Sequence, residues 1–143
     1  MNSYSKQPSI KFWIISVIAI LWNLLGVFAY LSQAFMNQDI ISTLSKPEQN
    51  YFNNLPVWVT AAFATAVFSG VFGAVSLLFK KKIALLLFVV SLIGLCTQQI
   101  FNFFIQDYMK ISGLNLILPI ATTIIGVFLV WYTFRMNKRG LLN

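Results

Sequence analysis

The sequence predicts an all-α membrane protein, a bundle of four transmembrane helices that forms a single domain over residues 1–143. The first observation is composition. The chain is 59% hydrophobic and 9% charged, whereas about a quarter of the residues in a soluble domain are charged. The second is the presence of four apolar stretches that reach the ~20 residues needed to cross a bilayer. Lipid is therefore expected to surround most of the chain.

The membrane spans are expected at residues 12–35, 57–79, 83–105 and 114–134. Lys6 and Lys11 precede the first span, as basic residues precede the apolar part of a signal peptide. The apolar part is longer here than the ~7–15 residues of a signal peptide, and no small-residue cleavage site follows it. We therefore expect the first span to be a retained membrane anchor.

Basic residues gather at one end of the predicted bundle. Eight of the ten lie there, namely Lys6, Lys11, Lys80, Lys81, Lys82, Arg135, Lys138 and Arg139. The opposite end holds the other two and all three acidic residues, Asp39, Glu48 and Asp107. Because cytoplasmic loops are enriched in lysine and arginine, both termini are predicted to be cytoplasmic. The Lys80–Lys82 turn could also bind anionic lipid headgroups, but its topological role is the favoured interpretation.

The loop between the first and second spans contains a helix-start signal. In Ser45-Lys46-Pro47-Glu48 a hydroxyl is followed three residues later by a carboxylate, which is the spacing of a capping box. Proline suits the first turn of a helix, where its missing N–H would have had no partner. A short interfacial helix through Tyr51 is therefore expected in this loop.

Small residues recur along the second span on one helix face. Transmembrane helices associate through close backbone approach, which small residues permit. The residues expected to pack helices together are Ala62, Ala66, Ser69, Gly70 and Gly73 in this span and Gly126 in the fourth. The neighbouring helix could belong to the same chain or to a second copy of the protein, and packing inside the bundle is favoured.

Two adjacent glutamines, Gln98 and Gln99, lie about 10 Å from the end of the third span, and Asn102 follows one turn later. Placing an unpaired carboxamide in hydrocarbon costs free energy. The polar side chains at this depth are therefore expected to face one another inside the bundle. The candidate ligand-binding residues are Tyr30, Gln33, Thr65, Gln98, Gln99, Asn102, Asn115 and Thr122. An interhelical hydrogen-bond network is the favoured arrangement, and a pocket for a neutral solute, a lipid group or a partner's side chain is the alternative.

Residues that carry chemistry are scarce. The chain has no histidine, one cysteine and three acidic residues, so it offers no recognisable metal-ligand set and no nucleophile with an adjacent base. We therefore expect neither an enzyme nor a cofactor. Cys96 lies in an apolar run and is expected to be a small buried side chain. Nucleic acid is not an expected partner, because the basic residues flank apolar runs and do not form one face.

Two stretches carry a family resemblance, LWNLLGVFAYLSQAFM at residues 21–36 and PVWVTAAFATAVFSGVFGAVSLLFKKK at residues 56–82. They resemble a family of short, four-span bacterial inner-membrane proteins of uncharacterised function, and the likeness extends through Asn102-Phe103-Phe104. Such proteins are sometimes labelled sugar transporters, but the Pro-Gln pair of the semi-SWEET sugar carriers is missing here. The resemblance implies the four-span topology and a bacterial inner membrane, and it transfers no functional residue.

The sequence favours a non-catalytic accessory or interaction protein that self-associates through the second span or joins a larger membrane complex. The alternative is a facilitator or carrier of a small neutral solute, with Gln98, Gln99, Asn102, Thr65 and Thr122 along its path. A lipid- or quinone-binding protein is a third hypothesis. Membrane lipids are expected partners in every case.

Overall fold

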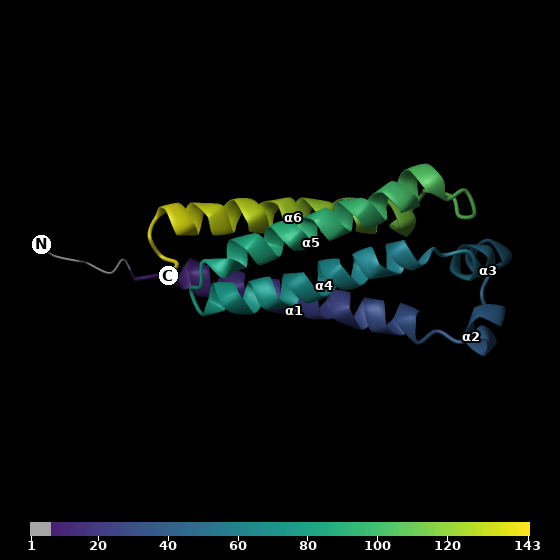
Figure 1. The fold of residues 1–143 in the computed structure, drawn as a ribbon, viewed down its shortest axis with the longest axis horizontal. Helices are drawn as coiled ribbons and strands as arrows, with labels where there is room; N and C mark the ends of the chain where they lie inside the picture. The colour runs from purple at the N-terminus through teal and green to yellow at the C-terminus, as the bar shows by residue number, and fades with distance from the viewer. Residues whose placement is uncertain (1–6) are drawn as a thin grey trace, which may run out of the picture.

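The computed structural model describes residues 7–143, so the predicted topological role of Lys6 lies outside the described residues. The helices are α1 (Ile10–Ala34), α2 (Gln38–Ser42), α3 (Lys46–Asn53), α4 (Val57–Leu78), α5 (Ile83–Ile100), the π-helical turn η1 (Phe101–Ile105) and α6 (Leu114–Lys138). Four of them, with η1 continuing α5, are long and apolar enough to cross a membrane. The predicted all-α fold with four spans is confirmed (Figure 1).

The spans match the predicted bounds within two residues except at the end of α6, and the third span contains a feature that was not predicted. α6 continues beyond the predicted end at residue 134 because its basic residues remain helical and lie over aromatic rings, Arg135 at 5.0 Å from the Trp131 ring centre and Lys138 at 4.8 Å from that of Phe134. The third span changes from α-helix to π-helix at Phe101, and the amide of Gln106 donates to the Phe101 carbonyl over 2.9 Å. Short π-helical turns are often found at functional sites.

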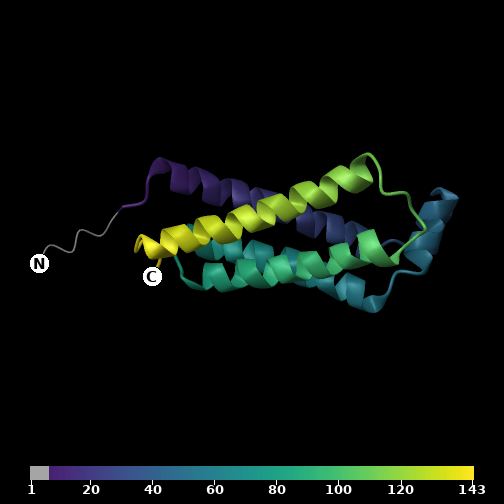
Figure 2. The ribbon, with the colours of Figure 1, turned by 90° about the horizontal axis from the view of Figure 1, so that it is seen from above.

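The long helices form two layers, α1 with α4 and α5 with α6, and α4 and α5 join the layers (Figure 1). The close helix pairs are α4 with α5, α1 with α4, and α5 with α6. α1 and α6 slope in opposite directions in Figure 2 and do not pack along their lengths. The bundle therefore has a tightly packed pair in the middle and two outer helices that stand apart from each other.

The backbones of α4 and α5 approach each other closely at Gly94. A Cβ atom added to Gly94 would lie 2.9 Å from the carbonyl oxygen of Ala62 and 3.0 Å from the amide nitrogen of Ala66, so only glycine fits there. The Ser91 hydroxyl donates to the carbonyl oxygen of Ala66 over 2.6 Å, directly beside this contact. We call this contact of Ala62, Ala66, Ser91 and Gly94 the α4–α5 seam.

The residues expected to pack helices together occupy several positions in the bundle. Ala62, Ala66, Gly70 and Gly73 are buried, whereas Ser69 is half-buried. Their neighbours are helices of the same chain: a Cβ on Gly70 would collide with Asn23 of α1, and one on Gly73 would touch Phe88 of α5. The small-residue face of α4 is therefore occupied within the bundle.

The hydrophobic core fills one half of the bundle. Phe12, Leu77, Ala84 and Met136 belong to one buried cluster, and each lies near the end where both described chain ends and the α4–α5 turn are found (Figure 1). We call this half the basic end, since it also holds the predicted topology residues Lys80, Lys81, Lys82, Arg135, Lys138 and Arg139. The opposite half, which carries α2 and α3, is called the cap end.

The cap end contains the expected short helix and one that was not expected. α3 begins with the predicted capping box, in which the Glu48 carboxylate accepts hydrogen bonds from the Ser45 amide (3.0 Å) and the Ser45 hydroxyl (2.6 Å). α2 was not predicted, although Asn37 caps it by accepting from the Ile40 amide over 3.0 Å. Asparagine is a favoured N-cap residue, so Asn37 was the signal for α2.

Cys96 is exposed on the surface of α5 and is not buried. The expectation of a buried small side chain is therefore wrong. An apolar run in a membrane helix faces lipid as readily as protein, so the apolar neighbours of Cys96 did not determine its direction.

Candidate functional site

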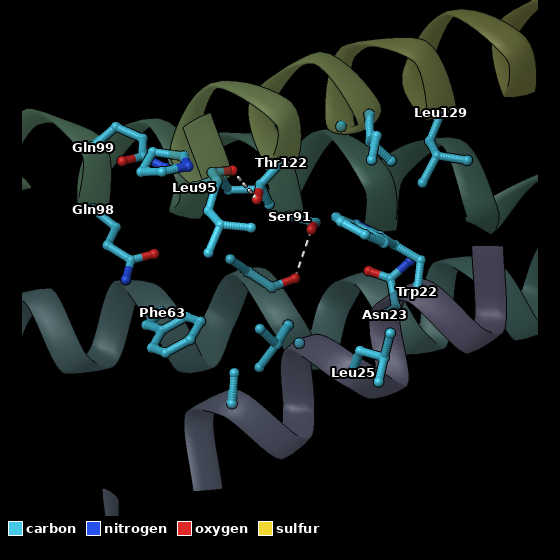
Figure 3. Close-up of a pocket in the computed structure, with 18 of the residues that line it drawn as sticks. Trp22, Asn23, Leu25, Phe63, Ser91, Leu95, Gln98, Gln99, Thr122 and Leu129 are labelled. Carbon is cyan, nitrogen blue, oxygen red and sulfur yellow. Dashed lines mark hydrogen bonds between the residues drawn. The ribbon is translucent and has the colours of Figure 1, made fainter. Parts of the chain in front are cut away.

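The bundle encloses a partly open cavity of about 380 Å³ between α1, α4, α5 and α6 (Figure 3). This volume lies within the ~300–1,000 Å³ range of small-molecule sites. The walls are largely apolar, and they are formed by Trp22, Leu25, Gly26, Ala29, Phe63, Ala66, Val67, Phe88, Leu95, Leu118, Pro119, Ile125, Gly126 and Leu129. The cavity lies where α1 and α6, the two outer helices, do not pack along their lengths.

Three carboxamides lie together where the cavity approaches the cap end. Gln98, Gln99 and Asn102 all line it, as their spacing along one helix face suggested. The Asn102 side-chain nitrogen donates to the Gln99 side-chain oxygen over 3.4 Å. Gln98 points toward the cavity from α5 (Figure 3). Its side chain makes no hydrogen bond within residues 7–143, so its carboxamide is free to bond to a molecule in the cavity.

A hydrogen bond connects this polar group to the cap. The Tyr51 hydroxyl of α3 donates to the Asn102 side-chain oxygen over 2.8 Å, and the two rings of Tyr51 and Phe101 lie 6.0 Å apart. Trp58 also packs edge-on against Phe101, and the two ring centres lie 5.9 Å apart. Burial raises the pKa of the Tyr51 hydroxyl. The cap is therefore fastened to the cavity end through a half-buried tyrosine.

The opposite end of the cavity contains polar groups that were not predicted to bind a ligand. Asn23 donates to the carbonyl oxygen of Ala19 over 2.8 Å, one turn earlier in α1, and its side-chain oxygen lies against Gly70. Trp22 and Asn23 lie at the far end from Gln98 in Figure 3, with Ser91 between the two ends. An asparagine in the middle of an apolar span was the signal for this position, whereas nothing in the sequence distinguished Trp22.

Half of the predicted ligand residues line the cavity, namely Gln98, Gln99, Asn102 and Thr122. Tyr30 lies edge-on against Phe63 and Phe68 instead, with ring centres 5.6 and 5.7 Å away. Thr65 and Asn115 are exposed, and Gln33 is half-buried outside the cavity. The structure therefore gathers the three carboxamides of α5 and η1 and one threonine of α6, and it places the others elsewhere.

The favoured hydrogen-bond network between spans does not form in the described part of the chain. Thr65, Thr97, Thr122 and Thr123 each donate to a carbonyl one turn earlier in their own helix, which is a common way for hydroxyls to be satisfied in helices. Among the side-chain hydrogen bonds of residues 7–143, the Ser91 bond to Ala66 is the one that joins two of the four long α-helices. The bundle is held mainly by packing.

The lining can bind a neutral molecule through apolar contact and hydrogen bonds. No lysine, arginine, aspartate or glutamate lines the cavity, and residues 7–143 contain no group of three His, Cys, Asp or Glu side chains placed to hold a metal ion. Gln99 and Pro119 also border a shallower groove of about 390 Å³ between α5 and α6, whose walls are otherwise mostly apolar. Gln99 thus lies between the cavity and an apolar groove.

Fold and site together define a four-helix integral membrane protein with a largely apolar internal cavity. No protein-family model, curated protein or solved structure matches the chain.

Proposed function

We propose that this protein is a non-catalytic membrane protein that binds a neutral, mostly apolar molecule of the lipid class in the cavity between α1 and α6. The observation that carries the proposal is Gln98, an unpaired carboxamide facing a cavity whose other walls are largely apolar. Binding sites combine apolar walls with a few polar groups that fix orientation. A ligand hydrogen bond to Gln98 would also relieve the free-energy cost of leaving a carboxamide unpaired in hydrocarbon.

The remaining hydrogen-bonding capacity favours a neutral ligand that carries oxygen atoms. The side-chain oxygen of Gln99 already accepts from Asn102, and that of Asn102 already accepts from Tyr51. The groups left free include the amide N–H groups of Gln98 and Gln99 and the side-chain oxygen of Gln98. A carbonyl, ester or hydroxyl oxygen on an apolar body matches this arrangement. A charged ligand does not, because no residue of opposite charge lines the cavity to compensate for desolvation.

Native mass spectrometry after gentle detergent extraction tests this proposal, with Gln98→Leu as the variant and Gln33→Leu as its control. Both substitutions remove one glutamine, but only Gln98 lines the cavity. We expect a co-purifying neutral molecule whose affinity falls about two- to tenfold in Gln98→Leu, as expected for the loss of one hydrogen bond. Equal effects of the two substitutions, or a bound species that is always charged, would refute the proposal.

The role of an accessory or interaction protein remains a second candidate, supported by the surface of the outer helices. Only 11% of the apolar window of α1 and 6% of that of α6 are buried inside the bundle, so both helices could face lipid or a partner. Self-association through α4 is disfavoured, because α1 and α5 of the same chain occupy its small-residue face. A carrier path is also disfavoured, since Thr65 lies outside the cavity.

The proposed location is the bacterial inner membrane, with both termini in the cytoplasm. The family resemblance supports the membrane, and the charge asymmetry supports the orientation. A fluorescent or protease-sensitive tag placed after residue 143 tests the orientation in intact cells. If the tag were accessible only from outside the cell, the proposed orientation would be wrong.

A further inference from the structure

The last described residues of the chain fold back on the lysine turn. The amide of Lys82 donates to the carbonyl oxygen of Asn143 over 2.9 Å, and the amide of Asn143 donates to that of Lys80 over 2.7 Å. Leu142 is only 4% exposed and belongs to the hydrophobic core. We call this pairing of residues 141–143 with residues 80–82 the C-terminal clasp.

The clasp is possible because α4 and α6 end in the same way. In α6, the amides of Gly140 and Leu141 donate to Asn137 (3.0 Å) and Met136 (3.1 Å), which is a Schellman motif with a left-handed residue after the helix. Gly140 holds that position with φ +74°. The chain then reverses and directs Leu141 to Asn143 toward the lysine turn, so that two basic segments far apart in sequence lie side by side.

The corresponding motif at the end of α4 contains an unusual residue. The amides of Lys80 and Lys81 donate to Leu77 (2.9 Å) and Ser76 (2.8 Å), so Lys80 takes the place that Gly140 has in α6. Lys80 has φ +56° and is the non-glycine residue with positive φ among residues 7–143. A left-handed conformation is strained for a lysine, whose Cβ crowds the backbone, and is not strained for glycine. Membrane topology requires a positive charge in the turn but does not require it at this strained position.

The basic end has cations without carboxylate partners. Lys81, Lys82, Arg135, Lys138 and Arg139 are exposed, and Lys80 is half-buried. The acidic residues all lie at the cap end, at the far end of the bundle: Asp39 in α2, Glu48 in α3 and Asp107 in the loop before α6. The clasp therefore concentrates positive charge that no acidic side chain of the described chain neutralises.

The aromatic contacts of the α6 cations place this charge at a particular depth. Arg135 lies over Trp131 and Lys138 over Phe134, and tryptophan rings in membrane proteins favour the headgroup level. We infer that the clasp brings Lys80–Lys82 beside the α6 cations Arg135, Lys138 and Arg139. Together these basic residues form a binding site for the headgroup of an anionic phospholipid. This site is separate from the cavity, whose lining is uncharged.

Lipid titration monitored by native mass spectrometry tests the inference on the full chain, with phosphatidylglycerol and phosphatidylcholine as probes. We expect wild-type protein to prefer phosphatidylglycerol. Lys80→Gln should lower that preference about fivefold, the effect expected for one basic residue near an anionic surface, and Lys46→Gln at the cap end should not. Excess inorganic phosphate should fail to displace the lipid, and displacement would show that a soluble anion is the ligand instead.

Two variants test the clasp while keeping every basic residue. Asn143→Pro removes the N–H that donates to Lys80, and Leu142→Asn removes the buried anchor. Both should lower the preference for phosphatidylglycerol at least threefold, and Asn143→Pro leaves the hydrophobic core intact if Leu142→Asn fails to fold. Wild-type preference in a folded Asn143→Pro protein would show that diffuse charge suffices and would overturn the inference. The binding of a neutral molecule in the cavity should be unchanged by Asn143→Pro.

Lys80→Gly provides an independent check. Removing strain at φ +56° should stabilise the fold, while removing the charge should weaken binding of phosphatidylglycerol. If Lys80 had only a structural or topological role, Lys80→Gly would change the stability of the fold and leave phosphatidylglycerol binding unchanged. Unchanged lipid preference in Lys80→Gly would contradict a headgroup contact by Lys80.

Discussion

The α4–α5 seam and the gap between α1 and α6 are opposite solutions to packing helices in lipid. At the seam, Gly94 lets two backbones touch and Ser91 adds a hydrogen bond between the helices. Between α1 and α6, Gly26 and Gly126 also line the interior, but each faces a side chain of a neighbouring helix, Val67 or Leu92. The glycine at the seam thus brings two backbones together, whereas Gly26 and Gly126 face side chains and border the cavity.

The largest expected effect comes from adding a methyl group to the seam. Gly94→Ala would place a Cβ atom at 2.9 Å from the backbone oxygen of Ala62, which cannot rotate away. We expect a loss of about 3 kcal/mol in the free energy of unfolding, at the upper end of typical overpacking effects. Reversible unfolding in mixed detergent micelles measures it.

Gly126→Ala is the matched control for Gly94→Ala. The added methyl group would lie 3.2 Å from a terminal methyl group of Leu92, a flexible side chain beside the cavity. This variant should lose less than about 1 kcal/mol, because a side chain can move more easily than a backbone. Equal losses at the two glycines would mean that seam and gap are packed alike.

The tightly packed basic end contains one polar defect. The Thr133 hydroxyl is fully buried and has no hydrogen-bond partner among the described residues. Thr133→Val should raise the free energy of unfolding by about 1 kcal/mol, because it removes an unsatisfied buried polar atom with little change in shape. Thr123→Val, which removes a hydroxyl bonded to Pro119, should not stabilise. A less stable Thr133→Val protein would show that the hydroxyl has a partner.

The contact between cap and cavity depends on one hydrogen bond. Tyr51→Phe keeps the ring but removes the donor to Asn102, which should cost about 0.5–1 kcal/mol. Hydrogen exchange of the α3 amides should accelerate about two- to fivefold if this bond holds the cap closed. Tyr108→Phe, at an exposed tyrosine of the same end, should leave exchange unchanged. Unchanged exchange in both variants would mean that aromatic packing alone fastens the cap.

The smallest expected effect concerns pH at the start of α3. The hydrogen bonds from the Ser45 hydroxyl and amide hold the pKa of Glu48 below its ordinary value of 4.5. The capping contribution should therefore be complete above that value and disappear as pH falls through the lower folded pKa. The amide NMR signal of Ser45 should titrate in this range, and Glu48→Gln should abolish the titration. A midpoint above 4.5 would contradict the bonded geometry.

The four spans were predictable because length and apolar composition nearly determine them, and the capping box at Ser45 was predictable because it is local. The directions of isolated polar side chains were not. Gln33 and Gln98 are the same residue in equally apolar surroundings, yet only Gln98 faces the cavity. In lipid, the hydrophobic effect does not decide which face of a helix turns inward. The register between helices decides instead which polar groups meet, and the sequence encodes that register only indirectly.

Occupancy of the cavity tests the central claim most directly, through native mass spectrometry of Thr122→Phe and Thr97→Phe. Both threonines bond to their own helix, but only Thr122 lines the cavity. The new ring at position 122 should fill the space, so the neutral molecule bound to the wild-type protein should be lost from Thr122→Phe and retained by Thr97→Phe. Retention of that molecule by a folded Thr122→Phe protein, or its absence from the wild-type protein, would contradict a lipid-class ligand in the gap between α1 and α6.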